Sequence, residues 1–226
     1  DAISFLEDYF TRKDLAILVG GSGLYVDAVI NGLDSFPEID SKIREQLNRK
    51  LAEVGLEGLK AQLKQLDPEY FEKVDLKNPH RVIRALEVCL GSGQPYSSFL
   101  EKERPLRPFK NIVVGITANR EVIYDRINQR VDIMMKQGLL QETKRVYQHA
   151  NLNALQTVGY RELFAYFDGD CNLDFSISEI KKNTRRFAKR QATWFKKDKN
   201  ILWFDYQTDI ETIISKISDK INVINS

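Results

Sequence analysis

The residues with the most evident chemistry are basic side chains gathered in one short segment near the C-terminus. From Lys181 to Lys199, nine residues are lysine or arginine and one is acidic, whereas the whole chain has 34 basic and 32 acidic residues. At helical spacing four cations share a face, while the side chains of Phe187, Gln191 and Trp194 point elsewhere. A basic face beside aromatic side chains suits a polyanion, and the alternative is a solvated surface helix. The four cations are Arg186, Lys189, Arg190 and Lys197.

A glycine turn with one hydroxyl, Gly20-Gly21-Ser22-Gly23, is the second chemical feature. An apolar run precedes it and a helical pattern follows it, so the Ser22 hydroxyl and the backbone N–H groups that open the helix can bind an anion. The dinucleotide fingerprint G-x-G-x-x-G requires glycine where Val26 stands, and the Walker pattern G-x-x-x-x-G-K-[ST] occurs nowhere in the 226 residues. The alternative is a tight strand-to-helix connection without a ligand.

Arginines recur at helical spacing in the segment NPHRVIRALEV, residues 78–88. Arg81 and Arg84 are three residues apart and therefore share a face that suits a phosphate backbone. The alternative is that Arg84 pairs with Glu87, one turn further along the same helix.

Two other segments carry candidate groups. Arg126 and Arg130 are four residues apart in the segment 120–137, where nearby aspartates make a surface ion-pair network the alternative. In the segment 158–162 a glycine and Tyr160 open a helical pattern, although Tyr160 can equally belong to the core.

The elements that must position these groups alternate between strands and helices, which predicts an α/β fold with a parallel sheet. Short apolar runs at 15–19, 111–117 and 201–205 predict buried strands. Helices are predicted at 2–13, 24–31, 120–137, 139–149, 159–167, 176–196 and 208–223, the third of them capped by Asn119.

A helical insertion interrupts this pattern between residues 35 and 107. Its apolar residues recur at helical spacing, Asp67-Pro68 and Asn78-Pro79 are helix-start signals, and Gly91 is expected to end its last helix. Leu90 belongs to the expected apolar face of that helix, and a charged, proline-containing loop at 101–108 closes the insertion. We therefore divide the chain into a core of residues 1–34 and 108–226 and an all-helical insertion of residues 35–107.

The bulk composition restricts the function classes. A chain that is 42% hydrophobic and 29% charged is an ordinary globular protein, and no apolar run reaches the roughly 18–20 residues that span a membrane. Two cysteines without ligand spacing and two histidines argue against a zinc site or a serine-type triad, so no protein-ligated metal is expected. The absence of a leader-like segment and the scattered cysteines predict a cytoplasmic protein that contacts no membrane.

Four motifs stand in one order and together resemble one family. They are GGSGLYVDAVINGL at 20–33, NPHRVIRALEV at 78–88, VGYREL at 158–163 and TRRFAKRQATWF at 184–195. The chain resembles the bacterial tRNA dimethylallyltransferases, also called tRNA isopentenyltransferases, over almost its whole length. The resemblance implies a P-loop-kinase-like α/β core with a helical insertion that grips the anticodon arm of tRNA.

The resemblance also implies the reaction. A dimethylallyl group passes from dimethylallyl diphosphate to the N6 amine of the adenosine 3′-adjacent to the anticodon, in tRNAs that read codons starting with U. The target base is flipped into a channel, Mg²⁺ accompanies the diphosphate, and the enzyme is expected to act as a monomer on the anticodon stem-loop.

Site residues follow from the same resemblance, motif by motif. Ser22, which stands where the family usually has threonine, is expected near the target amine. Groups on the diphosphate side are Arg120, Arg126, Thr184 and Arg185. The expected tRNA-binding residues are Arg44, His80, Arg81, Val82, Ile83, Arg84, Gly159, Tyr160, Arg161, Lys189, Arg190 and Gln191.

The sequence departs from the family at its start. The family's phosphate loop and its aspartate-bearing general-base segment lie several tens of residues before the glycine turn, and the 226 residues contain neither. We therefore expect the chain by itself to show little or no transferase activity. Two alternatives stay open: an adenylate isopentenyltransferase, against which the long insertion and the bulk of basic residues argue, and a non-catalytic RNA-binding fragment.

Overall fold

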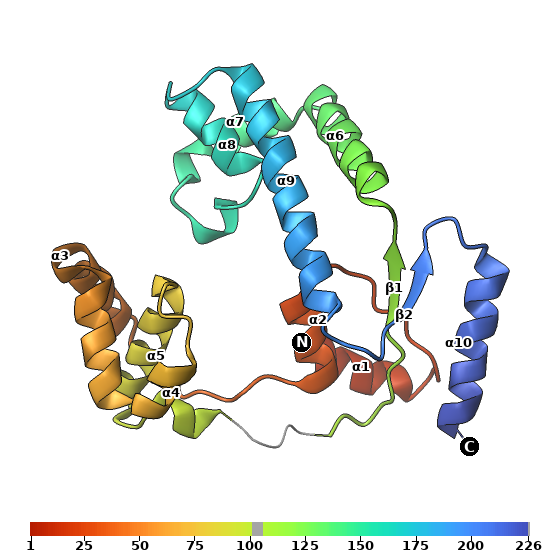
Figure 1. Ribbon diagram of the computed structural model, residues 1–226, viewed down its shortest axis with the longest axis horizontal. Coiled ribbons are helices and arrows are strands. Elements are labelled where there is room, and N and C mark those ends of the chain that lie inside the picture. The colour runs from red at the N-terminus through yellow and green to blue at the C-terminus, as the bar shows by residue number, and fades with distance from the viewer. Residues whose placement is uncertain (101–105, 226) are drawn as a thin grey trace. The chain divides into compact units, whose positions relative to one another are not determined.

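The computed structural model describes residues 1–100 and 106–225, which form two compact units (Figure 1). The first unit contains residues 1–16 and 27–108, and the second contains residues 17–26 and 109–226. This division groups residues 1–16 and 27–34 with the insertion, whereas the sequence suggested that they belong to the core. Most of the loop expected at 101–108 lies outside the described residues.

The first unit is helical, as the sequence predicts for its insertion. One aspartate and one asparagine cap the two helices that begin with proline. Asp67 Oδ1 accepts a hydrogen bond from the N–H of Tyr70 at 3.0 Å, and Asn78 Oδ1 accepts one from the N–H of His80 at 3.1 Å. The helices are α1 (Ala2–Phe10), α3 (Ser41–Leu66), α4 (Pro68–Lys73), α5 (Pro79–Ser92) and the 3₁₀ turn η1 (Tyr96–Phe99), and α2 (Gly23–Asn31) has residues in both units.

Glycines in these helices occur where the backbone has a positive φ or where another side chain packs closely. Gly55, at φ 71°, interrupts α3, and Gly93, at φ 71°, ends α5 two residues after the predicted Gly91. Gly91 instead stays in the helix, where an added Cβ would lie 2.6 Å from the Ile39 side chain. The predicted end at Gly91 is therefore wrong, because that glycine serves packing and not termination.

The core of the first unit lies between α3 and α5. Burial of the apolar side chains between these two helices supplies most of the driving force for folding of this unit. Leu90 was expected on the apolar face of the last helix of the insertion but is 43% exposed, so that assignment is wrong. The buried residues are Leu47, Leu59, Leu63, Val82, Ile83, Ala85 and Leu86.

The second unit holds the sheet. Strands β1 (Val114–Thr117) and β2 (Leu202–Asp205) pair in parallel with Val114 opposite Leu202, and they lie side by side although a long helical stretch separates them in sequence (Figure 1). The other elements are α6 (Arg120–Lys136), α7 (Leu139–Val146), η2 (Tyr147–His149), η3 (Asn153–Leu155), α8 (Tyr160–Phe167), α9 (Leu173–Phe195) and α10 (Ile210–Asn225). A small core of Val131, Leu139, Leu163 and Ile180 joins α6, α7, α8 and α9.

The strand predictions are confirmed in part. The strand predicted at 201–205 is present, and the one predicted at 111–117 is shorter and leaves Ile116 57% exposed. The run at 15–19 is not a strand, because no described residue pairs with its backbone, and Ile17 and Val19 are 82% and 87% exposed. The parallel α/β arrangement is therefore confirmed, with two strands among the described residues.

The observed end of α9 removes one residue from the predicted basic face. Helix α9 ends at Phe195, so Lys197 lies beyond it and its Nζ is 5.7 Å from the centre of the Trp194 ring. Asn119 precedes α6 but makes no side-chain cap. Within the described part of the chain no helix is long and apolar enough to cross a membrane.

Candidate functional site

The glycine turn of the second unit is held against the C-terminal part of α9. The Nε2 of Gln191 donates to the carbonyl oxygen of Gly21 at 2.7 Å. A Cβ on Gly21 would lie 2.1 Å from that nitrogen, and a Cβ on Gly23 would lie 2.3 Å from Cδ1 of Trp194. Neither glycine has a positive φ, so these two positions require glycine for close approach and not for backbone conformation.

Ser22 lies between these two contacts. Its side chain is exposed, and within the described residues its hydroxyl has no hydrogen-bond partner, so it can meet a substrate. The sequence had assigned Gln191 to tRNA and placed Trp194 away from the basic face. The structure instead engages the Gln191 amide at Gly21, a contact that no spacing rule predicts because the two residues are distant in sequence.

The basic run of α9 divides into paired and solvent-facing cations. Lys181 lies 2.7 Å from Asp132, and Lys182 lies 2.6 Å from Glu179. Lys189 and Arg190 are exposed, and neither has a carboxylate within ion-pair distance among the described residues; Arg190 lies over the Phe187 ring at 5.6 Å. Among the described residues, the cations of α9 from Arg185 onward therefore have no carboxylate partner and offer uncompensated positive charge to a polyanion.

The arginines expected on the diphosphate side occur in two places. Arg126 lies over the Tyr206 ring at 4.6 Å, and Arg120 opens α6 shortly after β1 ends. Both therefore lie near the carboxyl ends of the two parallel strands, where open α/β sheets bind their ligands. The guanidinium of Arg126 is attracted to the face of that ring by a cation–π interaction.

Arg185 and Thr184 are engaged further along α9. The Nη1 of Arg185 donates to Oδ1 of Asn128 at 2.7 Å, and its guanidinium lies 5.8 Å from the centre of the Tyr124 ring. The Thr184 hydroxyl donates to the carbonyl of Ile180 at 2.7 Å. That hydroxyl therefore remains able to accept a hydrogen bond but does not offer a donor to a diphosphate in this structure.

The motif Gly159-Tyr160-Arg161 opens α8 with a backbone that only glycine adopts freely. Gly159 has φ 106°, and its N–H donates to Oε2 of Glu162 at 2.8 Å. The buried Glu162 carboxylate also accepts from Asn183 of α9 at 2.8 Å and lies 3.6 Å from Arg161. Glu162 thus fixes the start of α8 and joins it to α9, a role that the sequence did not predict.

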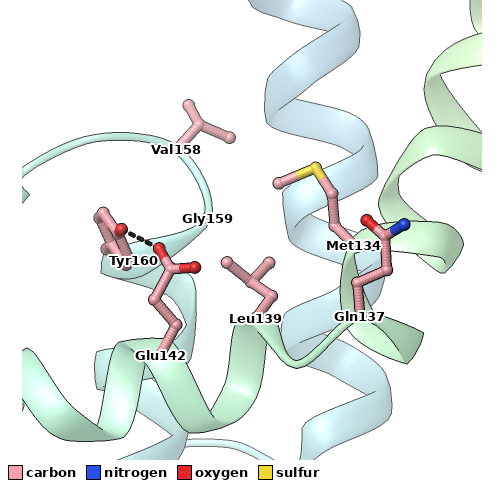
Figure 2. Close-up of a pocket in the computed structure, with 7 residues that line it drawn as sticks. All are labelled: Met134, Gln137, Leu139, Glu142, Val158, Gly159 and Tyr160. Carbon is pink, nitrogen blue, oxygen red and sulfur yellow. Dashed lines mark hydrogen bonds between the residues drawn. The ribbon is translucent and has the colours of Figure 1, made fainter.

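An open pocket of about 340 Å³ lies beside this motif (Figure 2). In it, Met134 of α6 and Gln137, the residue after that helix, lie opposite Tyr160 and Val158. The Tyr160 hydroxyl donates to the Glu142 carboxylate, and this hydrogen bond, with burial second, raises the pKa of Tyr160. The remaining lining residues are Leu139 and Gly159.

In the first unit one buried carboxylate organises two arginines. Oε2 of Glu87 lies 3.0 Å from Nη1 of Arg84 and 3.5 Å from Nη1 of Arg44, and Glu87 is 7% exposed. Arg84 also lies over the Phe36 ring at 5.3 Å. The pairing of Arg84 with Glu87 is therefore confirmed, and the side chains of Arg84 and Arg44 remain 39% and 47% exposed.

The remaining candidate residues of α5 differ in solvent exposure. His80 and Arg81 are exposed at the start of the helix. Val82 and Ile83 are 0% and 3% exposed, so their expected contact with tRNA is corrected for the side chains: these pack in the core because they face α3. Their effect on any ligand is to hold the helix that presents Arg81.

Comparison with known proteins identifies the family. The model of the IPP transferase family matches residues 1–198. A tRNA dimethylallyltransferase of Christiangramia forsetii is 53% identical over 222 residues, and one of Flavobacterium johnsoniae is 54% identical over 227, in each case covering 98% of this chain and 74% of the relative.

Solved structures of related transferases also align with this chain. The full-length tRNA isopentenylpyrophosphate transferase of Bacillus halodurans aligns at a TM-score of 0.63 and 35% identity, over 98% of this chain and 70% of that one. A eukaryotic dimethylallyltransferase acting on tRNA aligns at 0.74 with 22% identity, over 98% and 60%, and shows the shared fold. By its sequence and its α/β fold, this chain belongs to the IPP transferase family.

Proposed function

We propose that this chain is part of an enzyme that transfers a dimethylallyl group from dimethylallyl diphosphate to tRNA. The observation that carries the proposal is the family match over residues 1–198, together with relatives named tRNA dimethylallyltransferase that are about half identical across almost the whole chain. The acceptor in this proposal is the N6 amine of the adenosine 3′-adjacent to the anticodon, in tRNAs that read codons starting with U.

The reaction is a displacement at an allylic carbon. The amine nitrogen forms a bond to C1 of the dimethylallyl group, the bond from that carbon to the diphosphate oxygen breaks with its electron pair, and the nitrogen loses one proton. Positive groups stabilise the leaving diphosphate. Arg120 and Arg126 at the carboxyl ends of the strands suit that role, and the exposed hydroxyl of Ser22 suits a hydrogen bond to the amine.

The exposed cations suit the phosphate backbone of the anticodon stem-loop. In the first unit these are Arg81 and the free edges of Arg44 and Arg84, and in the second unit they are Lys189 and Arg190. Because an RNA stem-loop spreads its charge over many phosphates, it requires a broader basic footprint than a mononucleotide does. This favours tRNA over AMP as the acceptor.

Magnesium belongs to the proposal as a companion of the diphosphate. Among the described residues no group of three or more Asp, Glu, His or Cys side chains is arranged to hold a metal ion. Magnesium usually binds through one or two carboxylates together with substrate phosphates, so the diphosphate would supply much of its coordination, and we assign no step to the ion. As an enzyme of tRNA, the protein is proposed to work in the cytoplasm and as a monomer, which size-exclusion chromatography with light scattering tests.

The test is transfer of label. Full-length protein containing this chain is incubated with labelled dimethylallyl diphosphate and an anticodon stem-loop, and label on the RNA is the expected result. A stem-loop with inosine at the target position lacks the amine and serves as the control. Unlabelled RNA contradicts the proposal, and preferential labelling of AMP in a competition assay shows an adenylate isopentenyltransferase instead.

A further inference from the structure

We infer that Gln191 and Trp194 are positioning residues that hold the Ser22 hydroxyl in place for the reaction. This inference rests on the proposed function, because it assigns a task to Ser22. It changes the expected task of Gln191 from binding tRNA to fixing the glycine turn.

The geometry is a two-point attachment around a single residue. Gln191 and Trp194 are three apart on α9 and therefore lie on one face of the helix. Gly21 and Gly23 are the two neighbours of Ser22: the first accepts the hydrogen bond of Gln191 at 2.7 Å, and the second leaves room for the Trp194 indole. The peptide groups on both sides of Ser22 are thus fixed against the same helix.

Among the described residues, the hydrogen bond from Gln191 ties the backbone of the turn to another element. The run 15–19 that leads into it is not a strand, and most of its apolar side chains are exposed. After the turn, α2 begins at Gly23 and the N–H of Val26 donates to the Ser22 carbonyl at 3.0 Å, which orders the backbone but does not tie it to another element. The contacts with α9 therefore decide where the hydroxyl lies in the second unit.

Such placement matters because a misplacement of about 1 Å in a reacting group can lower the rate by about 100-fold. A side chain supported only by an irregular segment samples many positions. Two contacts to a long helix restrict that freedom before substrate binds, which is the physical basis of preorganisation.

Gln191→Met is the discriminating variant, since it keeps the length of the side chain and adds no charge but removes the N–H donor. We expect kcat at saturating tRNA and dimethylallyl diphosphate to fall by about tenfold, while Kd for tRNA stays within about twofold. Circular dichroism and thermal melting check that the variant is folded.

A double-mutant cycle with Ser22→Ala tests whether Gln191 acts through Ser22. We expect Ser22→Ala/Gln191→Met to be no slower than Ser22→Ala alone, because the hydrogen bond has no task once the hydroxyl is gone. Losses that multiply would overturn the inference. A higher Kd for tRNA with an unchanged kcat in Gln191→Met would also overturn it, and would return Gln191 to the RNA-binding residues.

Two alanine substitutions in the turn form a matched pair. In Gly21→Ala the new Cβ displaces the Gln191 amide, so kcat should fall as in Gln191→Met. In Gly20→Ala the Cβ meets nothing within 4 Å, so kcat should stay close to that of the parent. Equal losses in both variants would contradict the inference. Full activity of Ser22→Ala would also overturn it while leaving the proposed transferase function intact, whereas absence of label transfer by the parent enzyme contradicts that function itself.

Discussion

Gln191 and Gly21 are joined by a hydrogen bond of 2.7 Å although 170 positions separate them in the chain. This bond connects the basic C-terminal helix to the glycine turn, the two features of the sequence that carry the most evident chemistry. It also explains why Gly21 lacks a side chain, since a Cβ there would occupy the place of the Gln191 amide. The helix that offers cations to a polyanion therefore also supports the hydroxyl proposed to act on the amine.

Arg81→Ala is predicted to weaken tRNA binding and to lower its salt dependence. Arg81 is exposed at the first turns of α5, and losing one phosphate contact lowers the slope of log K against log salt by about one unit. The measurement is Kd for an anticodon stem-loop at several potassium chloride concentrations. Lys73→Ala is the control, because Lys73 carries the same charge in the same unit but pairs with Glu69 at 2.7 Å. Identical slopes for the parent and Arg81→Ala would exclude the contact.

Glu87→Ala is predicted to destabilise the first unit. The change leaves the Arg44 and Arg84 guanidinium groups without their shared carboxylate, at an expected cost of about 1–3 kcal/mol in the free energy of unfolding. Chemical denaturation measures this cost. Glu69→Ala removes an exposed partner of an i, i+4 pair and should cost less than about 0.5 kcal/mol. Equal effects of the two changes would show that burial of the Glu87 carboxylate adds nothing.

Gly159→Ala is predicted to destabilise the second unit through the backbone alone. No heavy atom lies within 4 Å of an added Cβ, but φ is 106°, a value that L-residues rarely adopt and that costs about 1–2 kcal/mol. The free energy of unfolding should fall by that amount in Gly159→Ala and stay nearly constant in Gly20→Ala, which has equal space and no positive φ. A stability unchanged by Gly159→Ala would mean that the turn relaxes freely.

The first unit is predicted to lose stability at high pH because of Tyr96. Burial, followed by the nearby Tyr70, raises the pKa of Tyr96 from 10.0 to about 12, so the folded state keeps the phenolic proton after the unfolded state has lost it. The resulting stabilisation is complete below pH 10 and is lost as the pH rises toward about 12.

The free energies of unfolding at about pH 9 and about pH 11 measure this dependence. Tyr96→Phe should flatten it, whereas Tyr25→Phe, at a position that is 76% exposed, should leave it unchanged. A pH dependence that persists unaltered in Tyr96→Phe would assign the effect to other groups.

The amino-acid sequence alone determined the local structure and the family. The helix caps at Asp67 and Asn78 depend on neighbouring residues, so local sequence signals predict them, and the alternation of strand and helix patterns predicted the α/β class. The four ordered motifs predicted the family that the comparisons then confirmed.

Only the tertiary structure decided how the candidate groups are used. The donation of the Gln191 amide to Gly21 and the sharing of Glu87 between Arg84 and Arg44 depend on partners distant in the chain. The run 15–19 shows the same limit, because apolar composition predicts a strand but a strand forms only where another backbone supplies its hydrogen bonds. Local patterns indicate which residues can form an element, and packing between elements decides whether it forms and which of its side chains remain available for chemistry.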